Sequence, residues 1–414
     1  MPQIESFRAI EILDSRGRPT VKVTCRFPDG TQASASVPSG ASTGRAEALE
    51  LRDGDKNRYR GAGCRKAVAN VNQFISREFR GTSFSTQREF DNFLIALDGT
   101  PHKSRLGANA MLGCSLAFCR AASQQKQTPL YQHFAQEFSQ KAARLPRLSI
   151  NLFSGGKHAG GQVPIQDILL VPLAATIDES LTMTYEIYQA AAELCAKRFQ
   201  MRLLTADEGG LAPPCTCCEE MFELAVEAID RTDLSDSVKL AVDVAASHFQ
   251  TNGGYQLDGQ TLSGEEMVQK ILHWIDRYPL ISVEDALAEE DWVHWTSLME
   301  QAPHGVCIVG DDLLCTNPGR IERAIESRAA NTLLLKVNQI GTLTEAAEAN
   351  RLARAADWNV VISARSGETE DDWLADLAVG WSGDFIKVGS ITQSERLAKY
   401  NRLLEIEHET GWTI

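Results

Sequence analysis

The chain has 414 residues, of which 43% are hydrophobic and 23% charged, a composition typical of a globular protein. Its net charge of −14 argues against a general nucleic-acid binder, because no excess of basic side chains is left to displace phosphate counterions. The first residues lack a basic segment followed by a long apolar one, and no run of about 18 apolar residues occurs. We therefore expect neither a signal peptide nor a membrane span.

The ten cysteines are scattered through apolar segments, a pattern typical of small buried side chains in a reducing compartment. A cytoplasmic location is therefore expected. Cys215, Cys217 and Cys218 lie close together, but neither a second pair at CxxC spacing nor a nearby pair of histidines accompanies them. A zinc site is not favoured on that ground, and the role of this cluster stays open.

Residues 1–140 predict an α+β domain. Apolar and polar residues alternate over residues 4–37, which favours a β-meander, and a helical spacing of apolar residues follows from Gly61 to Phe138. One apolar stripe is formed by Val68, Val71, Phe74 and Ile75. Between the two parts, residues 38–44 are small and rich in serine and glycine, so they form either a linker or a mobile loop that closes over an anion.

Residues 141–414 predict a β/α barrel. Apolar runs that are typical of buried strands alternate here with amphipathic segments, and from the fourth run onward they recur about every 25 residues. The eight runs are Leu148–Phe153, Ile165–Val171, Leu240–Val244, Leu280–Val283, Val306–Val309, Leu333–Val337, Val360–Ile362 and Phe385–Val388. Eight units favour a closed barrel, whose active site is expected at the carboxyl ends of the strands.

Ionisable residues stand at the ends of several of these runs. Asp243, Glu284 and Asp311 follow three successive strands and would repel one another strongly unless a cation lay between them. Oxygen ligands without histidine or cysteine indicate Mg²⁺. The alternative is that each acid caps a helix or pairs with a lysine.

Two lysines and an arginine complete the set. Lys336 lies in the apolar run TLLLKVNQIGT, and a cation there either pairs with an acid or serves chemistry. Next to Mg²⁺ and Lys387 its pKa would fall, which makes it a candidate general base, with Glu208 as the acid. Arg365 and Ser366, together with the Ser39 loop, suit a phosphate group. This set predicts a β-elimination on a phosphorylated carboxylic acid.

Several long motifs resemble those of enolases over essentially the whole chain. They are ILDSRGRPTV at 12–21, SGASTG at 39–44, DEGGLAP at 207–213, VGDDL at 309–313, LLLKVNQIGT at 333–342, RSGETED at 365–371 and SERLAKYN at 394–401. The resemblance implies an N-terminal α+β capping domain on an enolase-type modified β/α barrel that opens ββαα, assembled as a homodimer. It also implies Mg²⁺-dependent dehydration of 2-phospho-D-glycerate to phosphoenolpyruvate.

The resemblance further implies roles for particular residues. Asp243, Glu284 and Asp311 would hold one Mg²⁺, and a second would arrive with the substrate and the Ser39 loop. Lys336 would remove the C2 proton, and Glu208, with Asp167 beside it, would help the 3-hydroxyl to leave. The remaining side chains would bind substrate, namely Ser39, His158, Gln166, Arg365, Ser366 and Lys387.

Three positions depart from the family pattern. Ala364 replaces a histidine before Arg365, Asp167 replaces a glutamate after Gln166, and Ala286 replaces a proline after Asp285. The first two lie on the side of the leaving group, while the metal ligands and the base are intact. Two alternatives to a phosphopyruvate hydratase therefore stay open: a paralogue that acts on a related phospho- or phosphono-carboxylate, and a catalytically inactive enolase-like binding protein.

Overall fold

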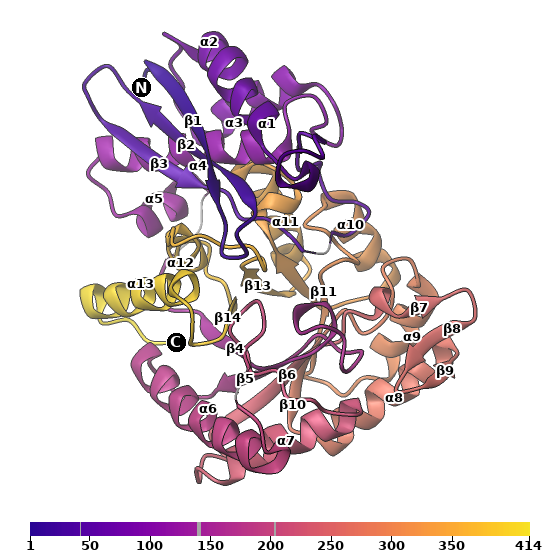
Figure 1. Cartoon of the computed structure of the whole chain (residues 1–414). Helices are drawn as coiled ribbons and strands as arrows, with labels where there is room; N and C mark the ends of the chain where they lie inside the picture. The colour runs from indigo at the N-terminus through magenta and orange to yellow at the C-terminus, as the bar shows by residue number, and fades with distance from the viewer. Residues whose placement is uncertain (42, 139–141, 203) are drawn as a thin grey trace.

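The computed structural model describes residues 1–41, 43–138, 142–202 and 204–414. Figure 1 shows the N-terminal sheet and its helices lying against one end of a larger β/α barrel. The expected boundary at residue 140 falls in 139–141, outside the described residues. No helix in the described ranges combines the length and the apolar character that crossing a membrane requires.

The N-terminal part contains the predicted meander. Three antiparallel strands pair in the order β1-β2-β3, and their bounds are Ser6–Leu13, Pro19–Arg26 and Gln32–Ser36. Helices follow: α1 Arg65–Ala69, the π-helical turn Asn70–Ile75, α2 Ser76–Phe79, α3 Gln87–Asp98, α4 Ala108–Gln125 and α5 Leu130–Glu137. Helix α4 packs on the sheet so closely that a Cβ on Gly113 would overlap Val23. The predicted stripe is right except for Phe74, which is 44% exposed.

The eight predicted strands form one closed barrel in the order β10-β11-β12-β13-β14-β4-β5-β6. Their bounds are β4 Arg147–Ser154, β5 Asp167–Pro172, β6 Val238–Asp243, β10 Leu280–Glu284, β11 Cys307–Gly310, β12 Thr332–Leu335, β13 Asn359–Ser363 and β14 Phe385–Gly389. Strand β5 runs antiparallel to both its neighbours, and the other pairs are parallel. The chain order β4-β5-α6-α7 is the implied ββαα opening.

Eight longer helices surround the barrel: α6 Ile177–Phe199, α7 Cys218–Asp230, α8 Gly264–Arg277, α9 Trp292–Gln301, α10 Pro318–Ser327, α11 Leu343–Ala355, α12 Trp373–Gly380 and α13 Ser394–Thr410. Local sequence sets their starts; at α8, Ser263 and Glu266 form a capping box. A small sheet of β7 Gln250–Thr251, β8 Gly254–Leu257 and β9 Gln260–Leu262 precedes α8. Strand β12 ends at Leu335, which leaves Lys336 at the mouth of the barrel.

Candidate active site

A cavity at the carboxyl ends of the barrel strands gathers most of the predicted site residues. Its lining consists of Ala41, His158, Gln166, Glu208, Asp243, Asp311, Lys336, Ser363, Ala364, Arg365, Ser366, Lys387 and Val388. Residues from the whole length of the chain thus meet in one place, as the barrel prediction requires. Three predicted site residues, Ser39, Asp167 and Glu284, are not part of this lining.

The predicted metal ligands Asp243 and Glu284 occupy paired positions at the ends of β6 and β10. Lys387 on β14 lies between them, and its Nζ donates to Asp243 Oδ2 at 2.8 Å and to Glu284 Oε2 at 2.7 Å. Gln166 Nε2 donates to the same Asp243 oxygen at 3.0 Å. Burial acts to lower the pKa of Lys387, but the two carboxylates outweigh it and raise the pKa well above its usual value.

The third predicted ligand, Asp311, pairs with the predicted base. Lys336 Nζ donates to Asp311 Oδ2, and Gln339 Nε2 donates to Asp311 Oδ1 at 2.8 Å. Burial acts to lower the pKa of Lys336, but Asp311 reverses this and the net pKa is raised. The sequence predicted a lowered pKa on the assumption that a cation stood beside the lysine. In this structure Asp311 instead neutralises the lysine itself.

The carboxylates still leave acceptors open. Among the described residues, Glu284 Oε1 and Gln166 Oε1 are buried and accept no hydrogen bond. Burial, with repulsion from Asp243, raises the pKa of Glu284 to about 8. Among the described residues, two groups other than the predicted triad bring potential metal-ligand atoms within 4.8 Å of one another. They are His158–Asp167–Glu208 and Asp285–Asp311–Asp312. Lys387 therefore lies between Asp243 and Glu284, and Lys336 lies against Asp311.

The predicted acid Glu208 lies beside His158. Its Oε1 is 3.8 Å from His158 Nε2, and its Oε2 accepts a hydrogen bond from Asn151 Nδ2 at 3.0 Å. Asp167 was expected to act beside Glu208 on the leaving group, but it is fully buried behind His158 and does not reach the cavity. The physical reason is its short side chain, whose oxygens are held by Ser154 and His158.

Arg365, the predicted phosphate-binding residue, reaches the cavity from the loop after β13. Its Nη1 and Nη2 donate to the two oxygens of Glu47 at 3.0 and 3.2 Å, and Nη1 also donates to Asn338 Oδ1 at 3.1 Å. The Ser366 hydroxyl accepts a hydrogen bond from Arg16 Nη1 at 3.0 Å. An N-terminal segment thus fixes both groups that the sequence assigned to phosphate.

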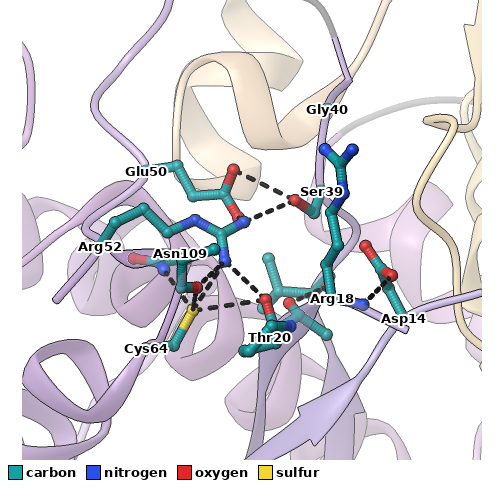
Figure 2. Close-up of polar contacts among 12 residues, drawn as sticks. Asp14, Arg18, Thr20, Ser39, Gly40, Glu50, Arg52, Cys64 and Asn109 are labelled. Atoms are coloured by element: carbon teal, nitrogen blue, oxygen red, sulfur yellow. Dashed lines mark hydrogen bonds and ion pairs between the residues drawn. The ribbon is translucent and has the colours of Figure 1, made fainter. Parts of the chain in front are cut away.

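Figure 2 shows that the Ser39 hydroxyl lies between Glu50 and Arg52. It donates to Glu50 Oε2 at 3.3 Å and accepts from Arg52 Nη2 at 2.7 Å. The Ser39 backbone pairs with Gly367, where a Cβ would overlap Asp14, so only glycine allows this approach. The Ser39 hydroxyl therefore anchors the loop in this structure, and its contact with substrate stays a prediction. Residue 42 of the same loop lies outside the described residues.

The motif SERLAKYN at 394–401 forms the first two turns of helix α13. Arg396 is fully buried, and its guanidinium donates to the carbonyl oxygens of Arg365, Ser366 and Val388 at 2.6–2.9 Å. Lys399 Nζ donates to Glu368 Oε2 at 3.0 Å, and Glu368 Oε1 accepts from the Arg365 amide. The motif holds the turn that carries Arg365. An arginine on the apolar face of a predicted helix is the sequence signal that could have indicated this supporting role.

Comparison with known proteins identifies the family. A model described as "Enolase, N-terminal domain" matches residues 4–134, and one described as "Enolase, C-terminal TIM barrel domain" matches residues 142–413. The chain belongs to the enolase family. It is 44% identical over 420 residues to Enolase B of Dictyostelium discoideum, covering 98% of this chain and 95% of the relative. It is 44% identical to an enolase of Mastigamoeba balamuthi and 45% identical to Enolase 1 of Methylococcus capsulatus, in both cases with 99% of this chain covered and 97% and 98% of the relatives.

Membership makes this protein an enzyme of the hydro-lyase class. Its departures from the enolase pattern occupy different places. Ala364 lines the cavity, Asp167 lies behind His158, and Ala286 is buried and is not part of the lining. Two of the three departures therefore lie at or beside the cavity, Ala364 in its lining and Asp167 in contact with His158.

Proposed function

We propose that this protein dehydrates 2-phospho-D-glycerate to phosphoenolpyruvate. The observation that carries the proposal is that Lys336 and Glu208, a potential base and a potential acid, line one cavity together with Arg365 and Lys387. A base, an acid and two further cations are the groups that β-elimination from a phosphorylated carboxylate needs.

Each group has a defined task in this reaction. Lys336 Nζ, in its neutral form, takes the proton from C2, and the electron pair spreads into the substrate carboxylate. Glu208 then gives its proton to the 3-hydroxyl, the C3–O bond breaks, water leaves, and the electron pair forms the C2=C3 double bond. Arg365 binds the phosphate, and Lys387 compensates negative charge at the carboxylate.

The donor set fits Mg²⁺. Asp243, Glu284 and Asp311 offer only oxygen, and Glu284 Oε1 and Gln166 Oε1 lack hydrogen-bond donors among the described residues. These residues would hold one ion, and a second would bind with the substrate. When bound, Mg²⁺ would stabilise the negative charge on the substrate carboxylate. Lys336, which donates to Asp311 in this structure, would lose this partner if Asp311 held the ion.

One observation favours a second candidate function. Ala364 gives the cavity a methyl group where enolases have an imidazole, which leaves room for a larger substituent. A related phospho- or phosphono-carboxylate would then be the substrate, handled by the same base and metal ligands.

The test is an ultraviolet assay of the purified protein with 2-phospho-D-glycerate and Mg²⁺, with Lys336→Ala as the matched inactive variant. Turnover of roughly 1–10³ s⁻¹ supports the dehydration. Turnover several orders lower, with Mg²⁺ still raising the melting temperature, overturns it in favour of the paralogue. Absence of both turnover and Mg²⁺ binding would indicate the inactive binding protein.

We further propose a cytoplasmic homodimer. The ten cysteines are all free, which suits a reducing compartment, and the homodimer rests on the family resemblance. Light scattering coupled to size exclusion would test the assembly, since a particle of about 45.5 kDa would contradict it.

A further inference from the structure

The carboxylate of Asp167 is held by two side chains, Ser154 and His158. Ser154 at the end of β4 lies opposite Asp167 at the start of β5 in the antiparallel register. The Ser154 hydroxyl donates to Asp167 Oδ1 at 2.5 Å, and Asp167 Oδ2 is 2.9 Å from His158 Nδ1. Ser154 and Asp167 are fully buried and do not line the cavity. The contact is therefore built into the barrel and is independent of substrate.

The other edge of the His158 ring faces the cavity. Its Nε2 lies 3.8 Å from Glu208 Oε1, and Glu208 Oε2 is fixed by Asn151 from β4. Five side chains thus form one line, in the order Ser154, Asp167, His158, Glu208 and Asn151. Only His158 and Glu208, the two in the middle of the proton path, reach the cavity.

We infer that Ser154 and Asp167 are positioning residues that orient His158 so that its Nε2–H can return a proton to Glu208. The inference rests on the proposed dehydration. As the hydroxyl leaves, Glu208 takes the proton from His158 Nε2 and passes a proton to the departing oxygen, and the imidazole then regains one from solvent. An ionised carboxylate on Nδ1 fixes a proton there, which leaves Nε2 as the mobile site.

The charges around the ring hold a proton on His158 and keep Glu208 ionised: burial acts to raise the pKa of Glu208, but His158 and the nearby cations outweigh it and lower the pKa. Burial acts to lower the pKa of His158, but Asp167 and then Glu208 outweigh it and raise the pKa to about 9. Asp243 also faces the ring and acts in the same direction. The imidazole therefore carries both protons at neutral pH. Glutamate at position 167 would place its carboxylate one methylene farther out, so the shorter Asp167 creates the arrangement.

The test separates the two halves of the reaction. Exchange of the C2 hydrogen of 2-phospho-D-glycerate with deuterated solvent reports Lys336 alone, whereas phosphoenolpyruvate formation also needs hydroxyl loss. Asp167→Asn is expected to keep exchange within about twofold while dehydration falls roughly 10²-fold, and Ser154→Ala to lower dehydration roughly tenfold. Ser154→Thr, which keeps the hydroxyl, should restore dehydration.

Ser180→Ala is the matched control, because it removes a buried hydroxyl that bonds to the Thr176 carbonyl in α6. A parallel fall of exchange and dehydration in Asp167→Asn, or no change in either, would overturn the inference alone. A wild-type protein that neither exchanges nor dehydrates would overturn the proposed function together with it.

A second measurement does not depend on turnover. Nitrogen-15 NMR of the wild-type protein at pH 8, with His158 assigned by comparison with His158→Gln, should show both ring nitrogens protonated. A neutral ring with no proton on Nδ1 would overturn the assignment.

Discussion

Lys336 donates a hydrogen bond to Asp311, so the proposed base and a proposed metal ligand neutralise each other in this structure. Base and metal site are therefore linked, because a cation that binds Asp311 competes with the ammonium for the same oxygen. The proposed proton abstraction by Lys336 and the proposed metal binding by Asp311 therefore depend on the same contact.

Lys336→Ala should abolish turnover while preserving Mg²⁺ binding. Loss of a general base costs about 10²–10⁴-fold in rate. Removal of the ammonium also leaves Mg²⁺ without a competitor for the Asp311 carboxylate. The Mg²⁺ concentration that gives half of the thermal stabilisation should therefore be equal or lower in the variant. Retained turnover would contradict the assignment of the base, and a lost thermal response would show that Lys336 supports the ion.

Glu47→Ala should lower both stability and substrate affinity. Glu47 and Arg365 are both almost fully buried, and breaking such a pair costs about 3–5 kcal/mol because the buried guanidinium loses the negative charge that compensates it. Urea unfolding and steady-state kinetics would report the two effects. Glu289→Ala is the control, since its partner Arg45 is 81% exposed and the change should cost less than about 1 kcal/mol.

Ser39→Ala should cost about 1 kcal/mol of stability and change kcat less than about threefold, because the hydroxyl bonds to Glu50 and Arg52 outside the cavity. Thermal unfolding and steady-state kinetics would measure both. A large loss of catalytic efficiency with unchanged stability would return Ser39 to the substrate contacts that the sequence predicted.

Ala364→His should raise the rate of 2-phospho-D-glycerate dehydration by roughly tenfold, because an imidazole on the cavity wall adds a hydrogen-bond donor near Glu208. The ultraviolet assay checks this, with Val293→Ala as the control, because Val293 in α9 is exposed and does not line the cavity. A lower rate would indicate a native substrate that fills the space beside Ala364.

The stability of the protein should depend on pH through His158. Its pKa is raised from the ordinary value of 6.5 to about 9 in the folded state, so the ring's contribution is complete below pH 6.5 and is lost as pH rises through 9. The difference in unfolding free energy between wild type and His158→Gln should shrink by about 3 kcal/mol from pH 6 to pH 10. Urea unfolding at the two pH values would test it, and a difference that grew with pH would contradict the sign.

The sequence predicted the barrel well because each strand is an apolar run between polar turns, a signal that residues carry locally. It also placed Lys336, Glu208, Asp243, Asp311 and Arg365 at one cavity, since strand ends of a barrel converge. What it missed depends on partners distant in the chain. Glu47 lies 318 positions from Arg365, and nothing near either residue indicates the contact.

The direction of the Lys336 pKa could not be read from the sequence either, because it depends on whether Asp311 faces the lysine or a cation. The position of Asp167 outside the cavity lining could not be predicted for a similar reason. Its single missing methylene is visible in the sequence, but its capture by Ser154 requires the register of β4 against β5.

The hydrogen bonds from Arg396 to the turn that carries Arg365 affect how the chain can fold during its synthesis. Arg396 follows Arg365 by 31 positions, and the Thr413 carbonyl accepts a hydrogen bond from Leu145 before the first barrel strand. Domains fold while the ribosome is still making the chain, from the N-terminus onward. Helix α13, drawn in yellow in Figure 1, is made last. The N-terminal sheet can form early, but the turn that carries Arg365 gains the hydrogen bonds of Arg396 only when α13 has emerged, so a nascent chain that stops before α13 lacks this support.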